Sequence, residues 1–143
     1  MAKIRVSTTV HARPDAVFEY VADLTKHSEW GNPKADLQVE HAGGSGVGAR
    51  YRSKQKFLGK DAGADITITA LEPGRRIAFD AIEHGKRFGH IFTFASEGDL
   101  TVITRDIDAP IPPVVSLIAK PAIRKEAQAG LEALKERLES ENG

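Results

Sequence analysis

Alternation of apolar and polar residues along most of the chain predicts a structure rich in β-strands. Residues 3–11 place Ile4, Val6, Thr8 and Val10 on one face and polar side chains on the other. This period of two is typical of a strand with one buried face. The same alternation recurs in residues 49–57, 64–71, 76–83, 86–95 and 100–108. The pattern indicates an antiparallel sheet with one apolar side.

After the first strand, the apolar residues of "ARPDAVFEYVADLTKHSEW" (residues 12–30) recur at the spacing of a helix instead of a strand. Pro14 fits the first position of a helix, where its missing N–H costs nothing. An apolar stripe at helical spacing follows it, made of Val17, Phe18, Tyr20, Val21 and Leu24. Asp23 fits the N-cap of a second short helix over residues 24–29. The segment therefore predicts two short helices, with Trp30 at their exit and His27 on an exposed helical face.

A long helix is predicted near the C-terminus, over residues 113–140. Its predicted apolar face consists of Val114, Leu117, Ile118, Ala122, Ala127, Leu131, Leu134 and Leu138. Pro121 interrupts the pattern and is expected to kink the first turns. A helix with such a stripe must cover the apolar side of the sheet.

Two short turns predict the pairing of the middle strands. A two-residue turn at His84–Gly85 sets Ala81 opposite Phe88, Phe79 opposite His90 and Ile77 opposite Phe92. A two-residue turn within "EPGR" sets Ala70 opposite Ile77 and Ile68 opposite Phe79. All of these residues then share one face, and a slip by one residue would destroy that agreement.

The last strand has two possible registers. An even loop after Ala95 turns Thr101, Ile103, Arg105 and Ile107 inward, whereas an odd, bulged loop turns Leu100, Val102, Thr104 and Asp106 inward. We favour the even loop, since an arginine can extend from an apolar wall while a buried aspartate needs a partner. In that register His90 lies opposite Arg105.

Composition narrows the class of protein. The 143 residues predict a single domain, 1–143, and the equal numbers of basic and acidic residues, 20 each, argue against a nucleic-acid partner. Arg50, Arg52, Lys54 and Lys56 are expected on a solvated outer face. With no cysteine and no apolar N-terminal run, the sequence predicts a cytoplasmic protein without stable membrane insertion. "GGSGVG" (residues 43–48) precedes a strand, so it predicts a hairpin loop and not a phosphate-binding loop.

Together with a strand ending near His41, before the "GGSGVG" hairpin loop, these elements have the order β–α–α–β₆–α, which resembles the START-like, Bet v 1-like (SRPBCC) superfamily. The similarity is carried by residues 10–30, "LEPGRRIAFD" (71–80), "TVITRDID" (101–108) and "GLEALKERLE" (130–139), and the bacterial polyketide cyclase/dehydrase branch is the most similar. The resemblance implies an α+β helix-grip fold. In this fold a seven-stranded curved antiparallel sheet wraps around a long C-terminal helix, with two short helices after strand 1. Arg13 departs from the family pattern, because a capping Ser or Thr is usual there.

The inward faces predict a ligand cavity with an apolar wall and few polar groups, the usual composition of a small-molecule site. The predicted ligand-binding residues are Tyr51, Ser53, Gln55, Phe57, Ile68, Phe79, Phe88, His90, Phe92, Ile103, Arg105, Leu117 and Ile118. His90 is the candidate catalytic residue, because a histidine can transfer protons near neutral pH. Arg105 is a candidate partner for a ligand carboxylate or carbonyl. The sequence contains no spacing of histidines and carboxylates that predicts a metal site, and no cofactor is expected.

Three functions are compatible with these features. The first is binding of a small hydrophobic or amphipathic ligand, lipid- or polyketide-like, by a monomer or homodimer. The second, implied by the resemblance, is a polyketide cyclase/dehydratase-type enzyme with His90 as general acid/base. The third is a toxin-like or regulatory partner protein. Access to the cavity is expected between residues 113–121 and the loops at 31–35 and 58–63.

Overall fold

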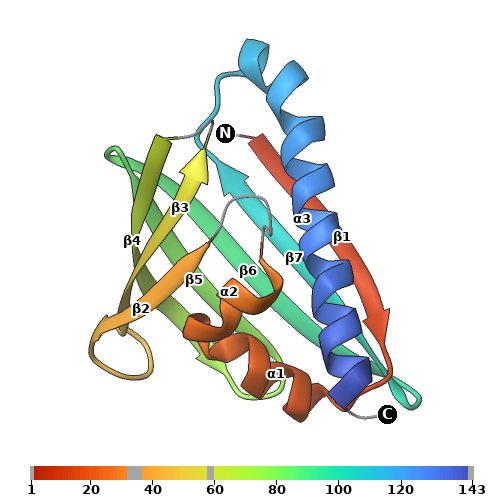
Figure 1. The fold of residues 1–143 in the computed structure, drawn as a ribbon. Coiled ribbons are helices and arrows are strands. Elements are labelled where there is room, and N and C mark those ends of the chain that lie inside the picture. The colour runs from red at the N-terminus through yellow and green to blue at the C-terminus, as the bar shows by residue number, and fades with distance from the viewer. Residues whose placement is uncertain (1, 32–36, 58–59, 142–143) are drawn as a thin grey trace.

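The computed structural model describes residues 2–31, 37–57 and 60–141. The described residues form seven strands and four helical segments in the predicted order, except that the predicted second short helix is divided into a 3-10 turn and an α-helix (Figure 1). They are β1 (Ala2–Val10), α1 (Pro14–Ala22), the 3-10 helix η1 (Leu24–Lys26), α2 (His27–Trp30), β2 (Gln38–Gly43), β3 (Arg50–Phe57), β4 (Lys60–Glu72), β5 (Arg76–Glu83), β6 (Lys86–Glu97), β7 (Leu100–Ala109) and α3 (Pro113–Glu141).

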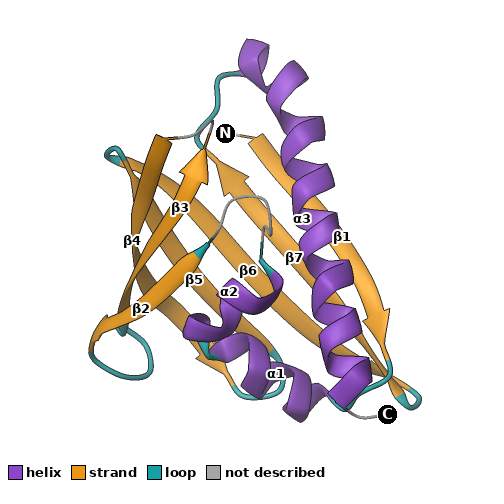
Figure 2. Ribbon diagram, in the orientation of Figure 1, coloured by secondary structure: helices purple, strands orange, loops and turns teal. Residues whose placement is uncertain are grey.

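The strands form one antiparallel sheet in the order β1-β7-β6-β5-β4-β3-β2. Apart from the pairing of β1 with β7, each strand lies beside its neighbour in sequence, so the sheet is a meander completed by the first strand. The helices lie on one side of the curved sheet (Figure 2). This arrangement confirms the α+β helix-grip fold.

The opening segment folds as its pattern predicts. Pro14 begins α1, and Arg13 at the N-cap makes no side-chain capping hydrogen bond. Asp23 caps η1, accepting a hydrogen bond from the Thr25 N–H at 3.2 Å. Val17 and Val21 are fully buried and anchor α1 against the sheet. Burial of each side chain stabilises the fold by roughly 1.5–3 kcal/mol.

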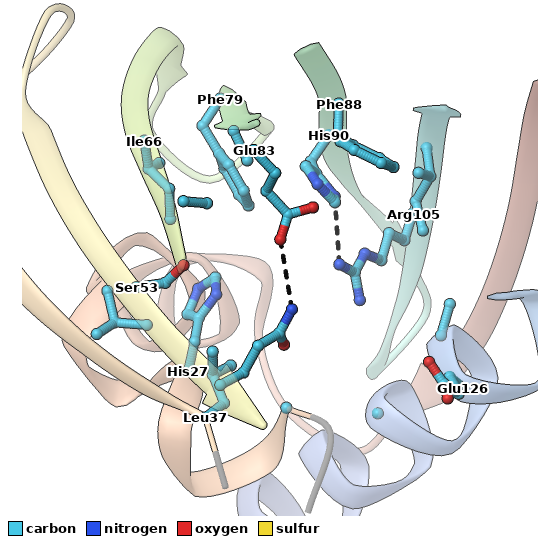
Figure 3. Close-up of a pocket in the computed structure, with 18 of the residues that line it drawn as sticks. His27, Leu37, Ser53, Ile66, Phe79, Glu83, Phe88, His90, Arg105 and Glu126 are labelled. Atoms are coloured by element: carbon cyan, nitrogen blue, oxygen red, sulfur yellow. Dashed lines mark hydrogen bonds between the residues drawn. The ribbon is translucent and has the colours of Figure 1, made fainter. Parts of the chain in front are cut away.

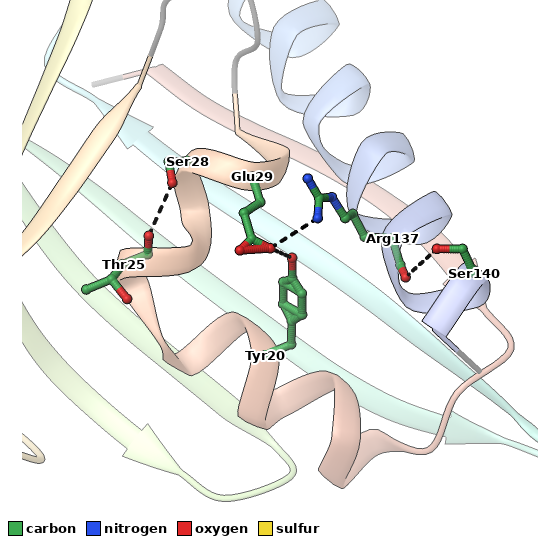
Figure 4. Close-up of polar contacts among 6 residues, drawn as sticks. All are labelled: Tyr20, Thr25, Ser28, Glu29, Arg137 and Ser140. Atoms are coloured by element: carbon green, nitrogen blue, oxygen red, sulfur yellow. Dashed lines mark hydrogen bonds and ion pairs between the residues drawn. The ribbon is translucent and has the colours of Figure 1, made fainter. Parts of the chain in front are cut away.

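Three helices meet at the carboxylate of Glu29 (Figure 4). The Tyr20 hydroxyl of α1 donates to Glu29 Oε1 at 2.6 Å, and Arg137 Nη1 of α3 donates to the same oxygen at 3.3 Å. Glu29 belongs to α2, so this cluster joins the two short helices to the C-terminal half of α3.

The β5–β6 hairpin has the predicted register. Ala81 pairs with Phe88, Phe79 with His90 and Ile77 with Phe92. His84 and Gly85 have φ of 50° and 76°, the left-handed conformation that a two-residue hairpin turn of this kind requires.

The predicted pairing of Ala70 with Ile77 is wrong. Ile68 pairs with Phe79 as predicted, but a bulge between Ile68 and Ala70 shifts the strand. Leu71 therefore lies opposite Ile77, and Ala70 opposite Ala78. A bulge adds one residue to one strand, which the turn sequence alone does not reveal.

β7 has the predicted inward face but a different register from the one expected. Thr101, Ile103 and Ile107 are buried, while Asp106 pairs with the exposed Arg5 on the other face. His90 lies opposite Ile107, not opposite Arg105, whose direct partner is Phe92. β6 continues to Glu97, which pairs with Leu100, so the connecting turn is two residues shorter than predicted.

Only the C-terminal half of α3 packs as predicted. Ala127, Leu131, Leu134 and Leu138 are buried, and α3 lies along β1. Val114, Leu117 and Ile118 are 79%, 80% and 83% exposed, and Ala122 is exposed too, which corrects the predicted inward face. The first turns extend past the end of the sheet and have no strand to cover (Figure 1). The predicted entrance to the cavity involves residues 32–35 and 58–59, which lie outside the described residues.

Candidate ligand cavity

A cavity of about 270 Å³ lies between the sheet and the helices α2 and α3 (Figure 3). Strands β3 to β7 supply most of its wall, and one face of α3 closes the other side. The lining residues are His27, Trp30, Gly31, Leu37, Val39, Ser53, Gln55, Ala64, Ile66, Phe79, Ala81, Glu83, Phe88, His90, Arg105, Ile107, Ile123, Glu126, Ala127 and Gly130.

Six of the predicted site residues line this cavity: Ser53, Gln55, Phe79, Phe88, His90 and Arg105. Three others, Ile68, Phe92 and Ile103, lie in the packed core and do not line it. Tyr51 is half-buried, with its ring 5.1 Å from that of His41. Leu117 and Ile118 are exposed on α3, and the side chain of Phe57 lies outside the described part of the chain.

His90 and Arg105 come together although they are not direct cross-strand partners. They lie diagonally on the same face of β6 and β7, a separation that a long side chain can span. Arg105 Nη2 donates to His90 Nδ1 at 3.3 Å. The guanidinium carbon lies 5.0 Å from the centre of the Phe92 ring, and the His90 ring stacks on Phe79 at 4.9 Å. Aromatic side chains thus hold both polar groups in place.

This contact fixes the proton on the neutral His90 ring. A guanidinium has only donors, so Nδ1 must accept and the ring hydrogen must reside on Nε2. Burial, together with the nearby charge of Arg105, lowers the pKa of His90 well below 6.5. At neutral pH His90 is therefore an uncharged donor toward the cavity.

Arg105 is a half-buried cation without an opposite charge beside it. Among the residues that the structure describes, it makes no ion pair, and its Nε is buried without a hydrogen-bond partner. Burial lowers the pKa of Arg105 to about 10, so it stays charged at neutral pH. An unpaired buried charge is unfavourable, which makes the site ready to accept an electron-rich group.

The helical wall contains His27 and Trp30, and here the sequence prediction for His27 is wrong. His27 is buried, not exposed; its Nε2 lies 2.7 Å from the Val21 carbonyl, and its ring 4.6 Å from that of Trp30. Burial lowers the pKa of His27 to about 4. Leu24, His27 and Trp30 are spaced by three, a helical signal for one shared inward face.

Glu83 is a lining residue that the sequence prediction missed. Gln55 Nε2 donates to its Oε1 at 3.5 Å, and burial raises the pKa of Glu83. Glu83 continues the inward alternation of Ile77, Phe79 and Ala81 at the end of β5, so the signal was present in the strand pattern. Glu126, exposed on α3, is the other acidic residue of the described lining.

A second, larger hollow of about 520 Å³ has a different character. Charged residues of the outer sheet face line it, among them Arg52, Lys54, Asp61 and Asp65. These side chains are exposed and Arg52 pairs with Asp65 at 3.3 Å. The basic row predicted on this face is thus solvated, and the internal cavity is the better candidate site.

No cluster of three or more His, Cys, Asp or Glu side chains that could hold a metal ion occurs in the described residues. None of the helices in the same part of the chain is long and apolar enough to cross a membrane.

A known protein family matches almost the whole chain. A family model described as polyketide cyclase / dehydrase and lipid transport matches residues 1–139. The chain belongs to this family, which confirms the resemblance seen in the sequence. No curated protein sequence is significantly similar to it.

Three solved structures show the shared fold. A crystal structure from Thermus thermophilus is 18% identical, with a TM-score of 0.80 over 99% of this chain and 100% of that one. The Zhui aromatase/cyclase of Streptomyces sp. R1128 is 16% identical, with a TM-score of 0.74 over 96% and 93%. The Aha1 dimer of Colwellia psychrerythraea is 18% identical, with a TM-score of 0.70 over 100% of both chains. At these identities the likeness extends to the fold alone.

Proposed function

We propose that the protein binds a small, mainly apolar ligand with one polar end in the cavity between the sheet and α3. The cavity itself is the observation that carries this proposal. Its volume of about 270 Å³ corresponds to roughly nine water molecules, so the described side chains leave room for a small molecule between the sheet and α3. A wall of Phe79, Phe88 and Ile107 interrupted by a few polar groups is the composition expected of a ligand site.

A matched pair of substitutions on α3 tests the proposal. Ala127 lines the cavity, whereas Ala129, two residues further on, is exposed. Ala127→Met should fill part of the space and weaken binding, and Ala129→Met should leave binding unchanged. Native mass spectrometry of protein isolated from cells, with a thermal-shift screen of short and long fatty acids and of small and multi-ring aromatic compounds, provides the measurement. The absence of any retained molecule and of any stabilising compound would end the proposal.

A second candidate is an enzyme of the cyclase or dehydratase type. The observation that favours it is the contact between His90 and Arg105 inside the cavity. In this arrangement Arg105 polarises a carbonyl, and the neutral His90 ring donates a hydrogen bond to the reacting group from Nε2. His90 does not act as a base from that atom, because Nε2 already carries the proton.

Turnover of an identified substrate would distinguish the enzyme from a binding protein, and substitution of His90 tests the part of His90 in it. On an identified substrate, His90→Ala should abolish turnover if His90 takes part, and His90→Gln should retain part of it through its amide donor. Unchanged turnover in both variants would exclude His90 from the reaction. A toxin-like or regulatory partner role, the cytoplasmic location and the choice between monomer and homodimer stay predictions.

A further inference from the structure

We propose that the cavity selects a small monocarboxylate, with its acid group at Arg105 and its apolar body against the aromatic wall. This inference rests on the proposed function and specifies the ligand class of the same site. It derives from the kind of polar groups that line the cavity, from their charge and from the volume.

The first support is the missing counter-charge of Arg105. Its Nε is buried without a partner, and the hydrogen bond of Nη2 in the described structure goes to a neutral histidine nitrogen. Arginine binds carboxylates through a fork of two parallel N–H groups. A ligand carboxylate would supply both the charge and the acceptors that the protein does not provide.

The second support is that the neighbouring groups also donate. His90 presents Nε2–H, as its contact with Arg105 requires. Trp30 lines the same cavity and its indole Nε1, which can only donate, is buried without a partner in the described residues. A ligand group that can only donate, such as a protonated amine, would leave these donors unpaired, which is how buried polar sites reject analogues.

The acidic residues in the cavity lining and the volume of the cavity narrow the class of ligand further. Glu83 and Glu126 are the acidic side chains of the described lining, and a second anionic group on the ligand would approach them. About 270 Å³ is slightly below the usual range for ligand pockets, about 300–1,000 Å³. The stacked rings of Phe79 and His90 offer a flat apolar wall. An aryl or short alkyl monocarboxylate fits these limits better than a long-chain lipid or a multi-ring polyketide.

Cinnamate and cinnamamide provide a matched pair of probes that differ in the acid group. We expect wild-type protein at pH 7.5 to bind cinnamate at least about tenfold more tightly than cinnamamide by titration calorimetry, because only cinnamate is an anion. Arg105→Met should remove this preference, and Arg124→Met, on an exposed position of α3, should keep it. Quenching of the single tryptophan, Trp30, offers an independent readout of occupancy.

The outcomes separate this inference from the proposed function. Equal binding of acid and amide, or binding of the amide alone, overturns the selection of an anion and leaves ligand binding intact. Binding of neither probe, together with no response to other apolar compounds, overturns both. Since the acid and the amide are compared on wild-type protein, the test holds even if Arg105→Met fails to fold.

Discussion

Arg105 donates a hydrogen bond to Nδ1 of His90 at 3.3 Å, across two neighbouring strands and within the candidate cavity. The two residues are diagonal neighbours, and the direct partner of each is apolar: Ile107 for His90 and Phe92 for Arg105. The contact therefore depends on the length of the arginine side chain. It decides which ring nitrogen of His90 is free to meet a ligand.

The first prediction concerns the tautomer of His90. Because Nδ1 accepts from Arg105 and burial lowers the pKa, His90 should be neutral and carry its hydrogen on Nε2 throughout the range from pH 6 to 8. Multiple-bond ¹H–¹⁵N correlation spectra measure this state directly, with His84 in the exposed β5–β6 turn as reference. In Arg105→Met, Nδ1 loses its donor and a mixture of tautomers should appear. A charged His90 ring at pH 7 would contradict the assignment.

The second prediction concerns the stability of the ligand-free protein. A half-buried charge without an opposite charge carries a desolvation cost that no partner offsets, so its replacement by an apolar residue of similar shape should not destabilise the protein. Arg105→Met should leave the free energy of unfolding unchanged or raise it by up to about 3 kcal/mol, since it leaves no carboxylate unpaired. Urea denaturation provides the measurement, and Arg137→Met is the control, with an expected loss of at most about 1 kcal/mol from its partly exposed pair with Glu29. A loss above about 2 kcal/mol for Arg105→Met would show that the arginine is structural.

The third prediction concerns acid stability. The pKa of His27 is about 4 in the folded protein and about 6.5 in the unfolded chain. The unfolded chain therefore binds the proton first as pH falls, and stability present at pH 7 is lost between about pH 6.5 and pH 4. This residue should account for about 3 kcal/mol of that loss.

His27→Gln isolates this contribution, since the amide can still donate to the Val21 carbonyl but does not titrate. Denaturant unfolding at pH 7 and pH 4.5 should show a weaker pH dependence in this variant. His84→Asn is the control, because His84 is exposed and asparagine tolerates its positive φ. An identical pH dependence in wild type and His27→Gln would refute the role of His27 burial.

The sequence predicted those features that depend on neighbouring residues. The hairpin at His84–Gly85 was predictable because two left-handed positions suit a two-residue turn, and the alternation then fixed the face of Phe79 and His90. The bulge at Ile68 and the length of the β6–β7 turn were not predictable. Neither leaves a clear mark on the alternation of apolar and polar residues in the sequence.

The candidate site was predicted only in part, because its helical wall depends on tertiary packing. His27 belongs to a helix of four residues, for which sequence alone does not define which face meets the sheet. Glu83 was overlooked because it is the last residue of its strand, although its spacing of two from Ala81 places it on the inward face. Leu117 and Ile118 match the apolar stripe of α3, but the sheet ends before it reaches them.

The last prediction concerns the different burial of the two halves of α3. Leu131 is fully buried, whereas Leu117 in the same helix is 80% exposed. Leu131→Ala should lower the free energy of unfolding by roughly 2–5 kcal/mol, through lost burial and the cavity that remains. Leu117→Ala should change it by at most about 0.5 kcal/mol, because the side chain loses little contact. Urea denaturation of both variants gives the comparison within one helix. If Leu117→Ala is as destabilising as Leu131→Ala, the first turns of α3 pack against the protein in solution, and the exposed position of Leu117 and Ile118 is wrong.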